Sequence, residues 1–343
     1  MLHDIHIPVM GICYTADTPV RVAHMGLTSV ISLVDDGLLE EYRMAYGERL
    51  GVDVGSPQTT RIGRIRAYLD FVAEEVDRKF DWIRGLRIAG CVESGALSNS
   101  GMTGVAGCLN DKDRYFLMLP AHSPLRAEYE QVCALSGLRR VAAEVALTEK
   151  MECGEIQANI MVNLNHEEAA LDAVRGFAAS KVKGSLVFSA GVNLGVFEEV
   201  AKHECFYRKG SETASMADSA PTATAPVGAA RVGAARVGVA PVGVAPTKKI
   251  ILKVSDFRSA MIQGRYLAKK GLDVYEYRIE SGVNCGGHAF VGAKVPMLEV
   301  LREFMAKKEE LFRATGGVPA RITAQGGLCT AEEISQDLAL GAD

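Results

Sequence analysis

The chain has 343 residues, of which 48% are hydrophobic and 23% are charged, and its formal net charge is −4. This composition excludes fibrous and disordered classes and predicts a globular protein with a large buried core. A slightly acidic chain without a basic stripe is not expected to bind nucleic acid.

The first part of the chain predicts a β-α-β unit. Residues 7–11 are typical of a short strand. Asp17, Thr18 and Pro19 then indicate a helix start, because proline is favoured at the first helical position. Residues 27–34 predict a buried strand. The short crossover between the two strands implies that they pair in parallel.

Residues 36–152 interrupt this rhythm and predict a helix-rich insertion. Within it, residues 61–84 carry apolar side chains at three- and four-residue spacing, which is the pattern of one helix face: Ile65, Leu69, Val72, Val76 and Phe80. The sequence gives no function for this insertion.

Alternating strands and helices resume after the insertion. Strands are predicted at residues 156–162, 185–189, 250–254, 272–280 and 320–324, and each is followed by a predicted helix. Seven such units favour a (β/α)8 TIM-type barrel in a single α/β domain, residues 1–343. The chain stops where an eighth strand would begin, so we expect a truncated chain or an open barrel that lacks this strand.

Residues 210–247 are rich in alanine, valine, glycine and proline and contain short repeats. Such a segment lacks the large side chains of a packed core. We interpret it as a flexible low-complexity insertion within the barrel, and a linker between two domains is the alternative.

The end of the chain's sixth strand carries the most informative motif. Gly286 and Gly287 allow a backbone to approach a ligand closely, and His288 places a titratable imidazole beside them. A second glycine pair, Gly326 and Gly327, follows the next strand. Because ligands of parallel α/β folds bind at the carboxyl ends of strands, we expect these motifs to form one site.

Several segments resemble the nitronate monooxygenase family, formerly called 2-nitropropane dioxygenases, and related flavin-dependent enoyl reductases. The resemblance covers about two-thirds of the chain in matching order and is carried by residues 7–11, 18–23, 157–161, 281–288 and 318–343. It implies a TIM barrel that binds FMN and oxidises a small-molecule substrate over the flavin.

The resemblance also implies roles for individual residues. His288 would be the catalytic acid/base, and Lys253 would face the N1/O2 edge of the flavin, unless it is a solvated lysine at a strand end. The other implied FMN contacts are Met10 and Gly11 against the ring, Asn159 as a hydrogen-bonding partner, Gly286 and Gly287 beside the ring or ribityl chain, and Gln325, Gly326 and Gly327 around the phosphate.

The strand before the glycine turn departs from the family pattern. Glu276, Arg278 and Glu280 alternate along it and therefore share one face. Buried charges must pair or bind a ligand, so this face predicts either a row of ion pairs or a ligand site. Asn284 stands where the family signature has glutamate, which leaves the substrate undetermined.

Two other functions remain open. The first is a flavin-dependent enoyl reductase of a lipid or polyketide pathway. The second is a non-catalytic barrel scaffold that uses the helical insertion as its binding face. The sequence also leaves open a homo-oligomer.

The sequence gives expectations for location and for metals. No apolar run approaches the roughly 18 residues of a membrane span, and residues 1–6 do not resemble a secretion signal. The eight cysteines are scattered, without the spacing of metal or redox motifs. We therefore expect a cytoplasmic protein with reduced thiols, no membrane contact and no metal site.

Overall fold

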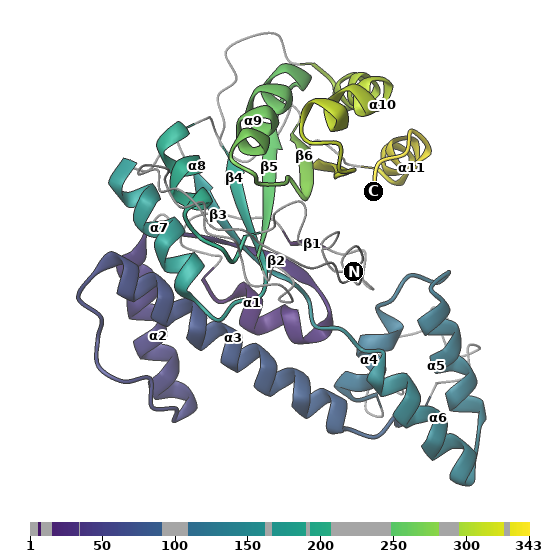
Figure 1. Ribbon diagram of the computed structural model, residues 1–343. Coiled ribbons are helices and arrows are strands. Elements are labelled where there is room, and N and C mark those ends of the chain that lie inside the picture. Colours follow the sequence, from purple (N-terminus) through teal and green to yellow (C-terminus); the bar gives the residue numbers. More distant parts are fainter. Residues whose placement is uncertain are drawn as a thin grey trace, which may run out of the picture. The chain divides into compact units, whose positions relative to one another are not determined.

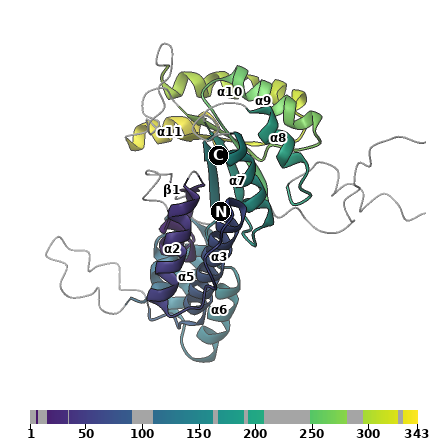
Figure 2. The same cartoon turned by 90° about the vertical axis from the view of Figure 1, so that its left-hand side faces the viewer.

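The computed structural model describes residues 6–7, 16–33, 35–90, 109–161, 167–189, 193–206, 248–280, 295–325 and 330–343. Two compact units divide the chain, Met1–Val187 and Phe188–Asp343, and the boundary falls within one strand. Each unit has the α/β organisation of parallel strands and covering helices (Figures 1 and 2).

The first unit contains the strands β1 (His6–Ile7), β2 (Thr28–Ser32) and β3 (Ile156–Met161), and β4 (Ser185–Ser189) begins in it. β2 pairs in parallel with both β1 and β3. The connection between β1 and β2 is formed by α1 (Thr18–Val22) and the 3-10 turn η1 (Ala23–Met25), so the predicted β-α-β unit is confirmed.

Long helices pack against one another in the first unit. α2 (Asp36–Leu50) and α7 (Glu167–Ala179) both pack against α3 (Arg61–Gly85), which is the longest helix in Figure 1. α3 buries the apolar face that its sequence periodicity predicts, including Ile65, Leu69, Val72 and Val76. The described residues between positions 36 and 152 are thus mostly helical, and their status as an insertion in a barrel stays a prediction.

Three shorter helices follow α3 and share a hydrophobic cluster of their own. They are α4 (Asp111–Leu117), α5 (Pro124–Ala134) and α6 (Gly137–Glu149). Phe116 and Tyr129 stack with ring centroids 5.2 Å apart, and Leu147 of α6 packs in the same cluster. The buried hydroxyl of Tyr129 donates a hydrogen bond to Asp113 at 3.0 Å. The insertion thus carries an apolar core of its own.

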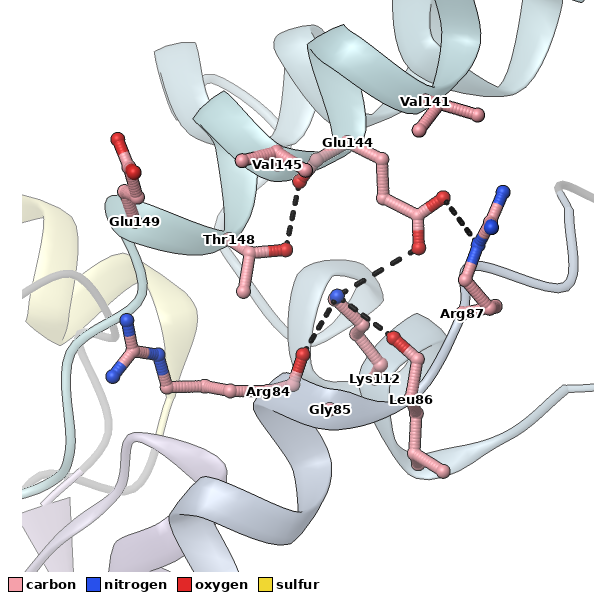
Figure 3. Close-up of a pocket in the computed structure, with 10 residues that line it drawn as sticks. All are labelled: Arg84, Gly85, Leu86, Arg87, Lys112, Val141, Glu144, Val145, Thr148 and Glu149. Atoms are coloured by element: carbon pink, nitrogen blue, oxygen red, sulfur yellow. Dashed lines mark hydrogen bonds and ion pairs between the residues drawn. The ribbon is translucent and has the colours of Figure 1, made fainter. Parts of the chain in front are cut away.

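A buried ammonium connects α4 to the end of α3 (Figure 3). Lys112 Nζ donates hydrogen bonds to the carbonyl oxygens of Leu86 at 2.8 Å and Arg84 at 3.1 Å. It also lies 3.7 Å from the carboxylate of Glu144 on α6. Burial lowers the pKa of Lys112, and Glu144 opposes only part of this shift. The last carbonyls of α3, which have no partner within the helix, are satisfied in this way.

The second unit has a parallel sheet in the order β5 (Lys249–Val254), β6 (Glu276–Glu280) and β7 (Arg321–Gln325). In its register Lys253 lies opposite Arg278, and Glu280 lies opposite Gln325. The accompanying helices are α8 (Leu194–Ala201), α9 (Phe257–Lys269), α10 (Met297–Ala314) and α11 (Ala331–Ala339).

All seven predicted strands are confirmed, although β1 has only two residues and β6 begins later than expected. The structure establishes parallel α/β units. The closed or open barrel and its single-domain organisation stay predictions, and the low-complexity segment 210–247 lies outside the described residues.

We predict that Lys112→Met destabilises the helical insertion by about 3 kcal/mol, because it leaves a buried carboxylate and two helix carbonyls with fewer partners. Urea unfolding followed by circular dichroism measures the change, and hydrogen exchange should rise within residues 111–149. Lys150→Met is the matched control, because Lys150 pairs with Glu128 at the surface and such pairs contribute less than about 1 kcal/mol. Equal losses in the two variants would contradict the prediction.

Candidate functional site

The β5–β6–β7 sheet has one apolar face and one charged face. Tyr277 points toward α9. Its hydroxyl lies so close to Gly264 that a Cβ atom at position 264 would have no room. Side chains alternate along a strand, so Glu276, Arg278 and Glu280 project from the opposite face. All three are buried. The predicted charged face therefore exists and is turned away from α9.

The lower part of this face is held by a buried ion pair. Arg278 Nε lies 2.7 Å from Glu276 Oε1, and the hydroxyl of Thr323 on β7 donates to the same oxygen at 2.7 Å. Burial alone would raise the pKa of Glu276, but the charge and hydrogen bond of Arg278, together with Thr323, outweigh it and lower the pKa. Glu276 is therefore ionised in the folded protein at neutral pH.

A second ion pair lies nearer the carboxyl ends of the strands. Lys253 Nζ approaches Glu280 Oε1 to 2.6 Å, and the two side chains are only 13% and 8% exposed. Lys253 is thus not a solvated lysine at a strand end. Its charge is neutralised by Glu280, although an ammonium has three donors and one contact leaves others for a further partner. The row of ion pairs that the alternating charges predict is present.

Gln325 lies beside these ion pairs, at the end of β7. It lies opposite Glu280 in the sheet register. Its side-chain oxygen Oε1 is buried and accepts no hydrogen bond from the residues that the structure describes. An unsatisfied buried acceptor costs about 1–3 kcal/mol, so this oxygen is a favourable place for a donor on a bound molecule.

The residues that continue these strands lie outside the described part of the chain. They include seven of the predicted site residues: Met10, Gly11, Gly286, Gly287, His288, Gly326 and Gly327. In sequence, however, Gly326 directly follows Gln325, and the Gly286–Gly287 pair comes six residues after Glu280. Because β6 and β7 are adjacent and parallel, the backbones that lead into the two glycine motifs leave neighbouring strand ends.

Asn159 belongs to the first unit, where it lies on β3 opposite Ser32 of β2. Asn159 is buried, and the hydroxyl of Ser32 is buried without a hydrogen-bond partner among the described residues. The same face of the unit carries Glu155, which accepts hydrogen bonds from Gln157 at 3.0 Å and Ser185 at 2.7 Å. This polar face was not predicted, although Gln157 and Asn159 alternate along β3 and were a visible signal.

The described residues contain no group of His, Cys, Asp and Glu side chains that could hold a metal ion. Among the same residues, no helix is both long enough and apolar enough to cross a membrane.

No protein-family model matches the chain, and no curated protein matches it. Among solved structures, it is similar to an IMP dehydrogenase/GMP reductase-like protein from Corynebacterium glutamicum, at 12% sequence identity and a TM-score of 0.36. The match covers 98% of this chain and 61% of the other, so the chain spans less than two-thirds of that protein's length. Similarity at this level defines neither the family nor the closure of the sheet.

We predict that Glu276 makes folding stability depend on acid pH. A carboxyl group whose pKa is lowered by folding stabilises the protein above its unfolded pKa, and this contribution is lost as the pH falls. Wild-type stability should therefore decrease as pH drops below about 5, near the range where an ordinary glutamate titrates. Glu276→Gln should be less stable at neutral pH and lose part of this acid dependence.

Urea unfolding at a series of pH values measures the effect in both proteins. Glu303→Gln is the control, since Glu303 pairs with Lys307 on the exposed surface of α10. An acid dependence that is the same in Glu276→Gln and wild type would show that the buried pair does not contribute.

Proposed function

We propose that the protein is an FMN-dependent oxidoreductase similar to nitronate monooxygenases, built on a (β/α) barrel. The observation that carries this proposal is the carboxyl edge of β6 and β7. Two adjacent parallel strands lead there into Gly-Gly motifs, and the side-chain oxygen of Gln325 is buried and unsatisfied. Bare glycine backbone at such an edge suits a phosphate, because its N–H groups can face the anion.

The described residues fit a flavin at this edge. The free acceptor of Gln325 can receive a hydrogen bond from an N–H or O–H group of the cofactor. Lys253 keeps donors for an oxygen or nitrogen of the ring, while Glu280 neutralises its charge. FMN, when bound, supplies the redox chemistry that no protein side chain provides.

The chain's own groups would position the substrate and move its proton. His288 follows the β6 end in sequence, and an imidazole is partly ionised near neutral pH, so it can take a proton from or return it to the reacting carbon. The Lys253–Glu280 pair would hold the ends of β5 and β6 in fixed positions. The substrate would be a small molecule with a removable proton.

Titration of the purified protein with FMN tests the cofactor. We expect saturable binding with a visible flavin spectrum. Turnover of nitronates with oxygen would support the monooxygenase assignment, whereas NAD(P)H oxidation with an enoyl thioester would favour the reductase alternative. A protein that binds no FMN would overturn the proposal and favour a non-catalytic scaffold.

We predict that Gln325→Leu weakens FMN binding about fivefold, since it removes one hydrogen bond worth about 1 kcal/mol. The same change removes an unsatisfied buried oxygen, so the FMN-free protein should be as stable as wild type or more stable. Fluorescence titration and thermal unfolding measure the two effects. Gln336→Leu, at an exposed position of α11, is the control and should change neither. Unaltered FMN affinity in Gln325→Leu would exclude the contact.

We predict that His288→Ala keeps FMN bound but lowers kcat by about 100-fold or more, the usual contribution of a general acid/base. The flavin spectrum reports retention of the cofactor, and steady-state kinetics report the loss. Turnover equal to wild type would remove His288 from the mechanism without affecting the assignment of the cofactor.

A further inference from the structure

α6 has an apolar face on the side opposite to its buried face. Leu147 packs into the insertion's hydrophobic cluster, whereas Leu138, Val141 and Val145 are 87%, 39% and 56% exposed. These three residues recur at the three- and four-residue spacing of one helix face. Leu138 and Val145 lie two turns apart and almost directly opposite Leu147 on the helix. The stripe is therefore not used in the packing of α6 onto the described part of its own chain.

A pocket of about 340 Å³ lies beside this stripe (Figure 3). Val141, Val145 and Thr148 of α6 form one side, and the end of α3 with Arg84 and Arg87 forms the other. Lys112 and Glu144 lie at its base and are already paired with each other. The pocket thus has an apolar wall next to the most exposed apolar residue of the helix, Leu138.

The charges of α6 are separated along its length. Arg139 and Arg140 lie near its start, and Glu149 lies at its end. Arg140 donates to the carbonyl of Ile88, but neither Arg139 nor Glu149 forms an ion pair with another described residue. Two parallel copies of α6 would place like charges together. Two antiparallel copies would place the basic start of each beside the acidic end of the other, which also aligns the helix dipoles favourably.

We propose that α6 is a self-association surface, on which α6 of a second copy of this chain packs in antiparallel orientation about a two-fold axis. When Val141 of each copy is level with Val145 of the other, Leu138 is level with Thr148, at the mouth of the pocket. At a rise of about 1.5 Å per residue, Arg139 then lies within about 3 Å of Glu149 along the axis. Leu138 fills the pocket of the partner, and the two unpaired charges meet.

The surface is self-complementary, as a two-fold interface requires, because Leu138 and the pocket that receives the partner's leucine lie on the same face. Its area is small, since one helix and its borders cannot approach the roughly 1,600 Å² of a standard interface. The dimer is therefore weak and in equilibrium with monomer. This inference does not depend on the flavin, because all of its residues belong to the helical insertion.

Sedimentation velocity of the full chain from low to high micromolar concentration tests the proposal. We expect the sedimentation coefficient to rise from monomer toward dimer. Leu138→Glu should raise the dissociation constant by at least about tenfold, because a charge would be buried in the pocket. Ile262→Glu, at a similarly exposed apolar position on α9, is the control and should leave association unchanged. Circular dichroism confirms that both variants are folded.

A charge exchange tests the orientation. Arg139→Glu and Glu149→Arg should each weaken the dimer, and the double variant should restore it, because the opposite charges again meet across the two-fold axis. A chain that stays monomeric at every concentration, or dimers that are insensitive to Leu138→Glu, would overturn the proposal. A dimer that Leu138→Glu disrupts but the double variant does not restore would overturn the antiparallel arrangement.

Discussion

The pairing of buried charges on β6 constrains the second unit more than any other interaction. An unpaired buried charge costs several kcal/mol. Glu276, Arg278 and Glu280 are therefore tolerated only where the neighbouring strands place a partner side chain at the same level of the sheet. Thr323 on β7 and Lys253 on β5 meet this condition. A slip of one residue would turn the carboxylates toward α9, where Gly264 and Tyr277 are already in close contact. The charges thus fix the register that places the ends of β6 and β7 side by side.

This constraint also determines what the strand ends can offer to a ligand. Two ion pairs neutralise four charges of this face, and the remaining charge, Arg321, lies beside Glu276 at the amino ends of the strands. The carboxyl ends therefore would not attract anions by charge alone. The groups that remain available to a ligand form directional hydrogen bonds. They are the free donors of Lys253 and the unsatisfied oxygen of Gln325. A site with few, well-placed polar groups on a neutral background selects by hydrogen-bond geometry. This agrees better with a flat heteroaromatic ring than with a small, highly charged substrate.

Much of the fold was predictable because it depends on local pattern. Buried strands and the apolar periodicity of α3 are visible in short windows of sequence. α2 is different, because its buried positions include charged residues instead of forming an apolar stripe. Glu40 and Arg43 pair with each other, and Asp36 pairs with Arg64 of α3. The buried face of α2 is therefore not visible in the sequence as a periodic pattern of apolar residues. Partners were not predictable either, since the Lys253–Glu280 contact depends on strand register and the Lys112–Glu144 contact joins helices 32 positions apart.

Buried charges are also paired within the helical insertion, but there an apolar stripe is left exposed. Lys112 and Glu144 neutralise each other inside the protein, and the aromatic cluster around Tyr129, with Ile83 of α3, fills the core that α4, α5 and α6 share. The exposed valines and leucine of α6 lie outside this cluster in the described part of the chain. An apolar stripe with an adjacent pocket carries a solubility cost unless something covers it. The unpaired Arg139 and Glu149 at its two ends favour a copy of the same helix, because an antiparallel copy brings each charge toward the opposite charge of its partner.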